Sequence, residues 1–319
     1  MKKKITIAVL ILALLLPVHV AAQTPVGVAV IGDSISHEYR CAPRGNSTTF
    51  NWVEIAERLR GVNFGFKTGN CYEYDHAWSG NTITYNMASM VGYTLADPSE
   101  VEKVVIWLGY NDIAGGASVS SLIATYTAQL DRLLTRFEPQ NILLVAVPQA
   151  DCGDNNASIT NFNSQLQALA TSKGTAFAPY SNYCNLLNSY ASGQNAYNYG
   201  GQNVNRWSWC YVSCIRIPDG HPGNIAQAIF LNSLLASFLE MEPVTEAEVL
   251  AMMGIGSAAT NTPSKTPTAT LTRTPRATAT ITHTPTITST PSPIFVMPCP
   301  NGYHIGEVVS STTVRCDPD

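Results

Sequence analysis

Short apolar segments alternate with amphipathic segments over most of the first 240 residues. Uninterrupted apolar residues that end at glycine or proline are typical of buried strands, and they occur at residues 28–31, 104–108 and 141–147. Two shorter strands are predicted at residues 62–66 and 175–178. Apolar side chains repeat at the spacing of a helix turn in residues 50–60, 118–137, 159–171 and 223–240.

Strands that alternate with amphipathic helices predict an α/β fold. We expect a mostly parallel sheet between two layers of helices, a three-layer α/β/α sandwich with right-handed crossovers. Residues 180–213 are rich in Asn, Tyr, Gly and Ser and show neither period, so this stretch is expected to be irregular.

Polar motifs follow the predicted strands or lie in the loops beside them. Residues at the carboxyl ends of parallel strands share one crevice, which is where α/β proteins place their ligands. The motifs are Gly32-Asp33-Ser34, Ser79-Gly80-Asn81-Thr82, Gly109-Tyr110-Asn111-Asp112 and Asp219-Gly220-His221-Pro222.

In this order the four motifs resemble those of the SGNH hydrolases, the GDSL-type lipase and esterase family, over about residues 26–240. The resemblance implies a flavodoxin-like sheet and a serine esterase that needs no cofactor and no metal. It implies Ser34 as the nucleophile and His221 as its base. It also implies an oxyanion hole made by the backbone N–H groups of Ser34 and Gly80 and the side-chain amide of Asn111.

The chemistry of these residue types agrees with the resemblance. A serine hydroxyl is a weak nucleophile without a base in hydrogen-bond reach, and imidazole titrates near neutral pH. Acyl transfer develops negative charge on the carbonyl oxygen, which requires donors aimed at it. A glycine at position 80 allows close approach of the backbone, and Asn111 donates N–H groups without adding a charge.

The third member of the triad departs from the family pattern. The family's acid usually stands three residues before the histidine, but here that position is Pro218. We expect Asp219 to orient His221 and to stabilise the imidazolium. The alternative is a backbone carbonyl near Ile217, which would leave a Ser–His dyad. Other polar neighbours have no expected catalytic role: the resemblance makes Asp33 and Asp112 structural, and His37 and His76 are predicted to be surface residues.

Residues 1–22 have the pattern of a secretory signal. Lys2–Lys4 form a basic start, Ile5–Val18 is mostly apolar, and Val20-Ala21-Ala22 supplies small residues for cleavage before Gln23. The alternative is an uncleaved N-terminal anchor. We expect the protein to be secreted.

Eight cysteines, all of them after residue 22, fit an oxidising compartment. The expected disulfides are Cys41–Cys71, Cys152–Cys184, Cys210–Cys214 and Cys299–Cys316. Sequence leaves the connectivity of the first six open. The sequence contains no C-x-x-C pair, so it gives no sign of a zinc site.

Composition divides the chain further. A catalytic domain is expected over residues 23–256, followed by a disordered Thr/Pro-rich linker at 257–293 that cannot form a core. Residues 294–319 are too few for a core of their own and predict a hairpin clasped by Cys299 and Cys316. That segment is either a contact module for a cell wall or polymer, or an inert tail.

Only 13% of residues are charged and the formal net charge is −4, which argues against nucleic-acid binding. The sequence therefore predicts a monomeric secreted esterase that cleaves short-chain or acetyl esters, its substrate a small molecule or an extracellular polysaccharide. Loops 72–78 and 197–209 are rich in Tyr, Trp and Asn, which suits sugar rings and ordinary packing equally. The alternatives are a lipase or phospholipase on longer acyl chains and a non-catalytic surface binding module.

Overall fold

The computed structural model divides the chain at residue 260 into two units, each described by itself. The described residues are 26–37, 49–68, 71–149, 152, 155–193, 196–205, 221–255, 303–310 and 313–318. For Asn205 and for the residues beyond 300, the backbone alone is described. The expected signal segment and linker lie outside these residues.

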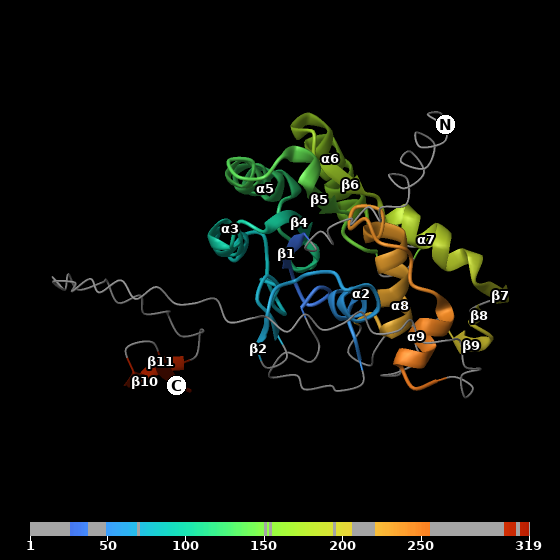
Figure 1. Cartoon of the computed structure of the whole chain (residues 1–319). Coiled ribbons are helices and arrows are strands. Elements are labelled where there is room, and N and C mark those ends of the chain that lie inside the picture. The colour runs from blue at the N-terminus through green and yellow to red at the C-terminus, as the bar shows by residue number, and fades with distance from the viewer. Residues whose placement is uncertain are drawn as a thin grey trace, which may run out of the picture. The chain divides into compact units, whose positions relative to one another are not determined.

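Four parallel strands form the central sheet, in the order β1-β4-β5-β6 (Figure 1). Their bounds are β1 Gly27–Gly32, β4 Val101–Trp107, β5 Ile142–Val145 and β6 Ala176–Ala178. Gly32 lies opposite Trp107, and Val145 lies opposite Ala178. The strands therefore end nearly in line, and the loops that follow them emerge at one edge of the sheet. The predicted parallel sheet is confirmed.

The strand expected at residues 62–66 is wrong as a regular strand. Asn63 makes only an isolated parallel bridge with Gly27, on the free side of β1. Gly65 then adopts a left-handed backbone, with φ of 86°, which interrupts an extended run. The chain turns there into a small antiparallel hairpin made of β2 (Lys67–Thr68) and β3 (Cys71–Tyr72).

Helices connect the strands, and sequence signals set their ends. The first begins at Asn51, whose side chain forms a capping box with Glu54, and it stops at Gly61 with φ of 68°. The bounds are α2 Trp52–Arg60, α3 Met87–Ala96, α4 Tyr110–Ala114, α5 Val119–Leu133, α6 Ala157–Lys173, α7 Tyr180–Ser189, α8 Asn224–Phe230 and α9 Glu246–Met252. None of the helices in the described part of the chain is both long and apolar enough to cross a bilayer.

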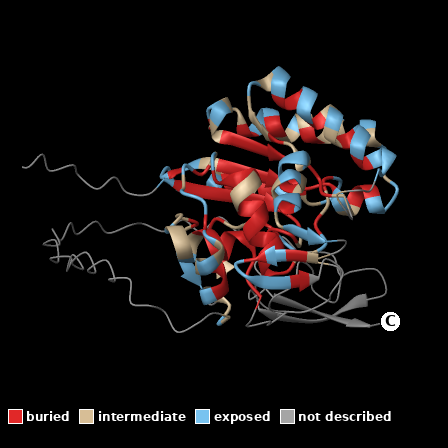
Figure 2. Cartoon of the chain, turned by 90° about the vertical axis from the view of Figure 1, so that its right-hand side faces the viewer, coloured by how far each residue is buried: buried red, intermediate tan, exposed pale blue. Residues whose placement is uncertain are grey.

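Successive side chains of the strands face two separate cores. Val28 and Val30 pack in the core beneath α2, α7, α8 and α9. Ala29 and Ile31 pack in the core beneath α3, α5 and α6. Figure 1 shows the two groups of helices on opposite sides of the sheet, and Figure 2 shows buried residues between the layers with exposed residues on the outer helix faces. The three-layer sandwich predicted from the sequence is confirmed.

The stretch at residues 180–213 is more regular than expected. It begins with α7 and continues into a three-stranded antiparallel sheet. Its tyrosines supply the missing apolar contacts: Tyr183, Tyr197 and Tyr199 are buried in the core on the α7 side. The strands are β7 Ala191–Gly193, β8 Ala196–Tyr199 and β9 Gln202–Asn205.

The helix predicted at residues 223–240 also differs in detail. Its α-helical part, α8, ends at Phe230 and passes into a π-helical turn over Leu231–Leu235. The following helix, α9, was not expected. It starts at a capping box of Thr245 and Glu248.

Beyond residue 300 the backbone forms the predicted hairpin. The strands β10 (Tyr303–Ser310) and β11 (Thr313–Pro318) pair antiparallel, with Ile305 opposite Cys316. Cys299 lies outside the described residues, so the clasp to Cys316 stays a prediction. The domain boundaries likewise stay predictions.

Candidate active site

Ser34 lies in a tight turn directly after β1. The backbone N–H groups of Ser36 and His37 both donate to the carbonyl oxygen of Asp33, at 3.2 and 2.8 Å. A Cβ atom at Gly32 would lie 2.8 Å from the Cβ of Ser36, so the turn requires glycine there. Ser34 is partly exposed while the residues on both sides of it are buried. The turn thus presents one hydroxyl at the carboxyl end of the sheet.

The second motif is attached to the same turn. The backbone N–H of Trp78 and the Nδ2 of Asn81 both donate to the carbonyl oxygen of Gly32, each at 3.3 Å. Gly80, between them, has φ of 87° and no atom within 4 Å of the place where a Cβ would stand. Its backbone is therefore accessible to a ligand, and it needs a conformation that glycine adopts readily.

The third motif follows β4, the neighbour of β1. Asn111 stands in the first turn of α4, and its Nδ2 donates to the carbonyl oxygen of Asn81 at 2.9 Å. An amide nitrogen carries two hydrogens, so one remains for a ligand. Hydrogen bonds thus run from Gly32 through Asn81 to Asn111 and join the first three motifs at one edge of the sheet.

Asp112 serves as an anchor for the loop that follows Gly80. Its Oδ2 accepts from the backbone N–H of Ile83 at 2.7 Å, and its Oδ1 accepts from the N–H and the hydroxyl of Thr84 at 3.1 and 2.7 Å. These bonds occupy both carboxylate oxygens. The arrangement agrees with the structural part expected for this residue.

Of the fourth motif, His221 and Pro222 are described, and they directly precede the buried amides of α8. Gln227 donates through Nε2 to the carbonyl oxygen of Ile35 at 3.1 Å and accepts from the N–H of Trp52 at 3.1 Å. Asn224 accepts from the N–H of Phe50 at 2.5 Å. His221 is partly buried three residues before Asn224, so the segment that carries it is tied to the residue after Ser34. Asp219 and Ile217 lie outside the described residues.

Asp33 is the strongly perturbed acid of this region. The pKa of its carboxyl is raised from 3.8 to about 7, mainly by burial and also by the negative charge of Asp112, against a hydrogen bond from the N–H of Ile35 that lowers it. Such a group has a protonation state that changes near neutral pH. Its fixed place in the turn beside Ser34 agrees with a structural part.

Two histidines differ from the surface residues that were expected. His37 is only 5% exposed, and its ring lies 4.6 Å from the ring of Trp78. The Nε2 of His76 lies 2.9 Å from Oδ2 of Asp97, and the His76 side chain is 11% exposed. Both side chains are therefore packed against neighbouring side chains rather than exposed to solvent.

The sequence left two interpretations open for the aromatic loops at residues 72–78 and 197–209, contact with sugar rings or ordinary packing. Tyr72, Tyr74, Tyr197 and Tyr199 are all buried in the cores. Of the two alternatives left open, packing therefore holds for these four side chains. Trp78 is 49% exposed and remains available to a ligand.

One of the four expected disulfide pairs lies wholly within the described residues. Cys152 and Cys184 are bonded and join the segment after β5 to α7. Cys71 is also disulfide-bonded, while Cys41, Cys210 and Cys214 lie outside the described residues. Within the described ranges, no group of three or more His, Cys, Asp or Glu side chains could hold a metal ion.

Sequence reasoning missed the supporting amides. Asn224 and Gln227 are fully buried, and their partners are about 175 residues away along the chain. The available signal was the polar residues within an otherwise apolar helix, since buried polar groups are nearly always hydrogen-bonded. Identifying their partners required the fold.

Comparison with known proteins places the chain among ester hydrolases. The sequence model of the GDSL-like lipase/acylhydrolase family matches residues 30–204. No curated protein sequence matches the chain.

Solved structures with similarity to the chain are esterases and acylhydrolases. An acetylxylan esterase from Geobacillus stearothermophilus is 14% identical, with a TM-score of 0.46, over 68% of this chain and 95% of that one. The lipase/acylhydrolase from Enterococcus faecalis is 13% identical, with a TM-score of 0.46, over 69% and 98%. The esterase EstA from Pseudoalteromonas sp. is 14% identical, with a TM-score of 0.44, over 67% and 99%.

Proposed function

The chain belongs to the GDSL-like lipase/acylhydrolase family, and on that premise we propose that it is a secreted serine esterase that removes short acyl groups, acetyl above all, from an extracellular carbohydrate. The observation that carries the proposal is the set of hydrogen bonds that brings the Ser34, Gly80 and Asn111 segments to one edge of the sheet. Members of the family hydrolyse esters, and these are the groups that such a reaction requires.

In the proposed reaction Ser34 Oγ attacks the ester carbonyl carbon while His221 takes the hydroxyl proton. The N–H groups of Ser34 and Gly80 and the free amide hydrogen of Asn111 stabilise the oxyanion. Collapse of this intermediate expels the alcohol, which receives the proton from His221, and leaves an acyl-Ser34 ester. Water, deprotonated by His221, then attacks the acyl carbon; the bond to Ser34 Oγ breaks, Oγ receives the proton from His221, and the carboxylic acid is released. Asp219, or alternatively a backbone carbonyl near Ile217, orients the imidazole.

Exposed aromatic side chains beside the motifs support a carbohydrate substrate. Trp78, Tyr85 and Tyr110 are 49%, 83% and 38% exposed, although aromatic rings of this size are usually buried. They lie in or beside the Gly80 and Asn111 motifs. Tyr and Trp combine an apolar ring face with a polar O–H or N–H group, and a sugar likewise combines apolar C–H faces with polar hydroxyls.

A chain-length series of p-nitrophenyl esters, from acetate to palmitate, tests this proposal. Hydrolysis should be fastest with acetate and should fall as the acyl chain lengthens, because the proposed site fits a short acyl group. In the Ser34→Ala variant the turnover should fall by about 10⁴-fold or more. A matched control, Ser189→Ala, changes an exposed serine at the end of α7 and should leave turnover unchanged.

The remaining outcomes each overturn a different part of the proposal. Preference for palmitate, again lost in Ser34→Ala, would make the protein a lipase. No Ser34-dependent turnover of any ester would favour a non-catalytic binding module.

A further inference from the structure

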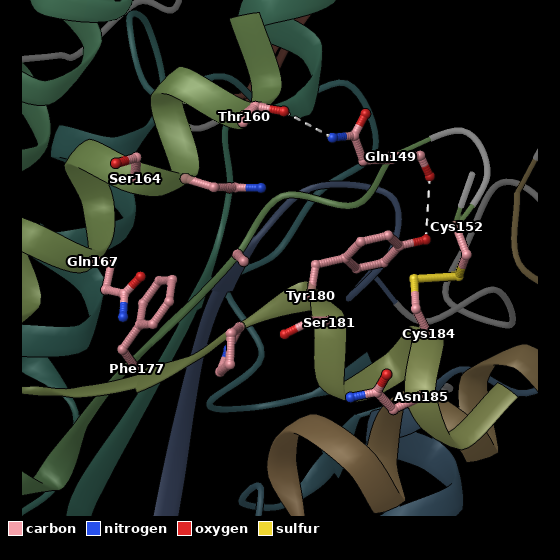
Figure 3. A pocket seen from close by; sticks show the side chains of 13 residues that line it. Gln149, Cys152, Thr160, Ser164, Gln167, Phe177, Tyr180, Ser181, Cys184 and Asn185 are labelled. Atoms are coloured by element: carbon pink, nitrogen blue, oxygen red, sulfur yellow. Dashed lines mark hydrogen bonds between the residues drawn. A yellow bond between two sulfur atoms is a disulfide. The ribbon is translucent and has the colours of Figure 1, made fainter. Parts of the chain in front are cut away.

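A pocket lies where the strands β5 and β6 end. Its volume is about 420 Å³, which is within the usual range for small-molecule sites. Residues of α6 and α7 form its two sides, and Phe177 of β6 lies between them (Figure 3). Its lining residues include no member of the motifs, of which the first and third follow β1 and β4, the second precedes α3 and the fourth precedes α8.

The lining of this pocket combines apolar and polar side chains, and none of the lining side chains that the structure describes is charged. Two aromatic rings, Phe177 and Tyr180, are half-buried. Around them stand amides and hydroxyls, which both donate and accept hydrogen bonds. The polar side chains are Gln149, Thr160, Asn163, Ser164, Gln167, Ser181 and Asn185.

Several contacts hold the pocket in its shape without a ligand. The hydroxyl of Tyr180 donates to the carbonyl oxygen of Gln149 at 3.2 Å, and Gln149 Nε2 donates to the hydroxyl of Thr160 at 3.1 Å. The disulfide from Cys152 to Cys184, both of them lining residues, joins the segment after β5 to α7 (Figure 3). A preorganised site loses less conformational entropy when it binds a ligand.

Other lining groups are available to a ligand. Ser164, Gln167, Ser181 and Asn185 are exposed, and their side chains make no hydrogen bond to any other residue in the described part of the chain. They stand on α6 and α7, facing each other across the two rings (Figure 3).

We propose that this pocket is a second binding site, for a neutral saccharide unit of a polysaccharide chain. A sugar ring presents C–H faces that match aromatic rings and hydroxyls that need both donors and acceptors. Among the residues that the structure describes, no lining side chain is charged, which favours a neutral ligand. The site would hold the polymer while its esters are cleaved at Ser34, and this last clause rests on the proposed function.

Binding of unacetylated neutral oligosaccharides to the full chain tests the proposal directly. The probes are xylohexaose and cellohexaose, measured by isothermal titration calorimetry, with an oligogalacturonate as the charged comparison. The pocket variant is Gln167→Ala with Asn185→Ala. The matched control is Gln165→Ala with Asn188→Ala, which removes the same side-chain types from the same helices outside the pocket.

At least one neutral hexasaccharide should bind, and binding should weaken by about 10-fold or more in the pocket variant, since two side chains that can hydrogen-bond to the sugar are lost. The control should bind as the unchanged protein does. Equal binding by the pocket variant, no binding of either neutral sugar at millimolar concentration, or tighter binding of the oligogalacturonate would each overturn the proposal.

Hydrolysis of p-nitrophenyl acetate by the same variants separates this proposal from the function of Ser34. The pocket variant should hydrolyse the small ester at the normal rate. A protein that binds the sugars but hydrolyses no ester would retain the second site and lose the proposed esterase activity. A protein that hydrolyses esters but binds no sugar would do the reverse.

Discussion

At the scale of single residues, the site depends on amides that each serve two partners. Asn111 uses one amide hydrogen to hold the carbonyl oxygen of Asn81, at 2.9 Å, and keeps the other for the proposed oxyanion. Asn81 in turn holds the carbonyl oxygen of Gly32. The position of the donor is thus fixed before substrate arrives, which is the condition under which such donors contribute most to catalysis.

Replacing Asn111 should therefore damage turnover more than stability. In Asn111→Ala we expect kcat for p-nitrophenyl acetate to fall by about 10²–10³-fold, the usual effect of losing one oxyanion donor. The free energy of unfolding should fall by only about 1 kcal/mol, for one lost hydrogen bond. Steady-state kinetics and urea unfolding measure the two effects. A kcat within about threefold of normal would remove Asn111 from the proposed oxyanion hole.

Asp33 should make stability depend on pH. Its pKa is raised by burial to about 7 in the folded protein, from an ordinary 3.8, so between these values the folded state binds more protons than the unfolded state. Stability from this group is therefore full below about pH 4, falls as pH rises to about 7, and is constant above it. The change amounts to at most about 4 kcal/mol, since one pKa unit corresponds to about 1.36 kcal/mol.

The Asp33→Asn variant isolates this effect, because the amide oxygen can still accept from the N–H of Ile35. The variant should gain stability relative to the unchanged protein as pH rises from 4 to 7, as measured by urea unfolding at each pH. A difference between the two proteins that stays constant over this range would show that Asp33 titrates normally.

At the scale of elements, the catalytic edge depends on where α8 is held. Gln227 sits fully buried in this helix and bonds both to Trp52 in α2 and to Ile35 after the nucleophile. The helix is thereby aligned with the turn that carries Ser34. An apolar residue at this position would pack well and still fail to hold the turn.

Gln227→Leu keeps the volume of the side chain and removes both bonds. It should lower the free energy of unfolding by about 2–4 kcal/mol, because a buried N–H and a buried carbonyl lose their partner. Gln165→Leu, at a partly exposed position on α6, is the control and should change stability by about 0.5 kcal/mol or less. Urea unfolding measures the loss of stability in both variants. An equal loss in the two would mean that the two hydrogen bonds of Gln227 contribute nothing to stability.

Prediction from sequence succeeded best for elements with a simple pattern. The strands β1 and β5 and the second half of β4 are continuous apolar runs, and both ends of α2 carry sequence signals, Asn51 with Glu54 at its start and Gly61 at its end. It failed for α7, where asparagines and tyrosines obscure the helical period, and for residues 62–66, where Gly65 ends the extended run. The pairings of Asn224 and Gln227 could not be predicted, because they join segments far apart along the chain.

At the scale of the whole molecule, two cores on opposite faces of the sheet fix one sheet edge, and the first three motifs, from Gly32 to Asp112, lie together there. The order of the motifs was readable from the sequence because each follows or precedes a regular element. The pocket between α6 and α7 was not, since its lining comes from two helices and a strand whose packing only the fold defines.

The central claim is that Ser34 is an activated nucleophile, and labelling by a fluorophosphonate tests it most directly. The probe phosphonylates a serine only when a base raises its reactivity. One adduct per chain should form, located by mass spectrometry on the peptide that contains Ser34. Labelling should vanish in Ser34→Ala and slow by about 10²-fold or more in His221→Ala, which loses the base. No adduct on the unchanged protein, or an adduct that persists in Ser34→Ala, would contradict the account.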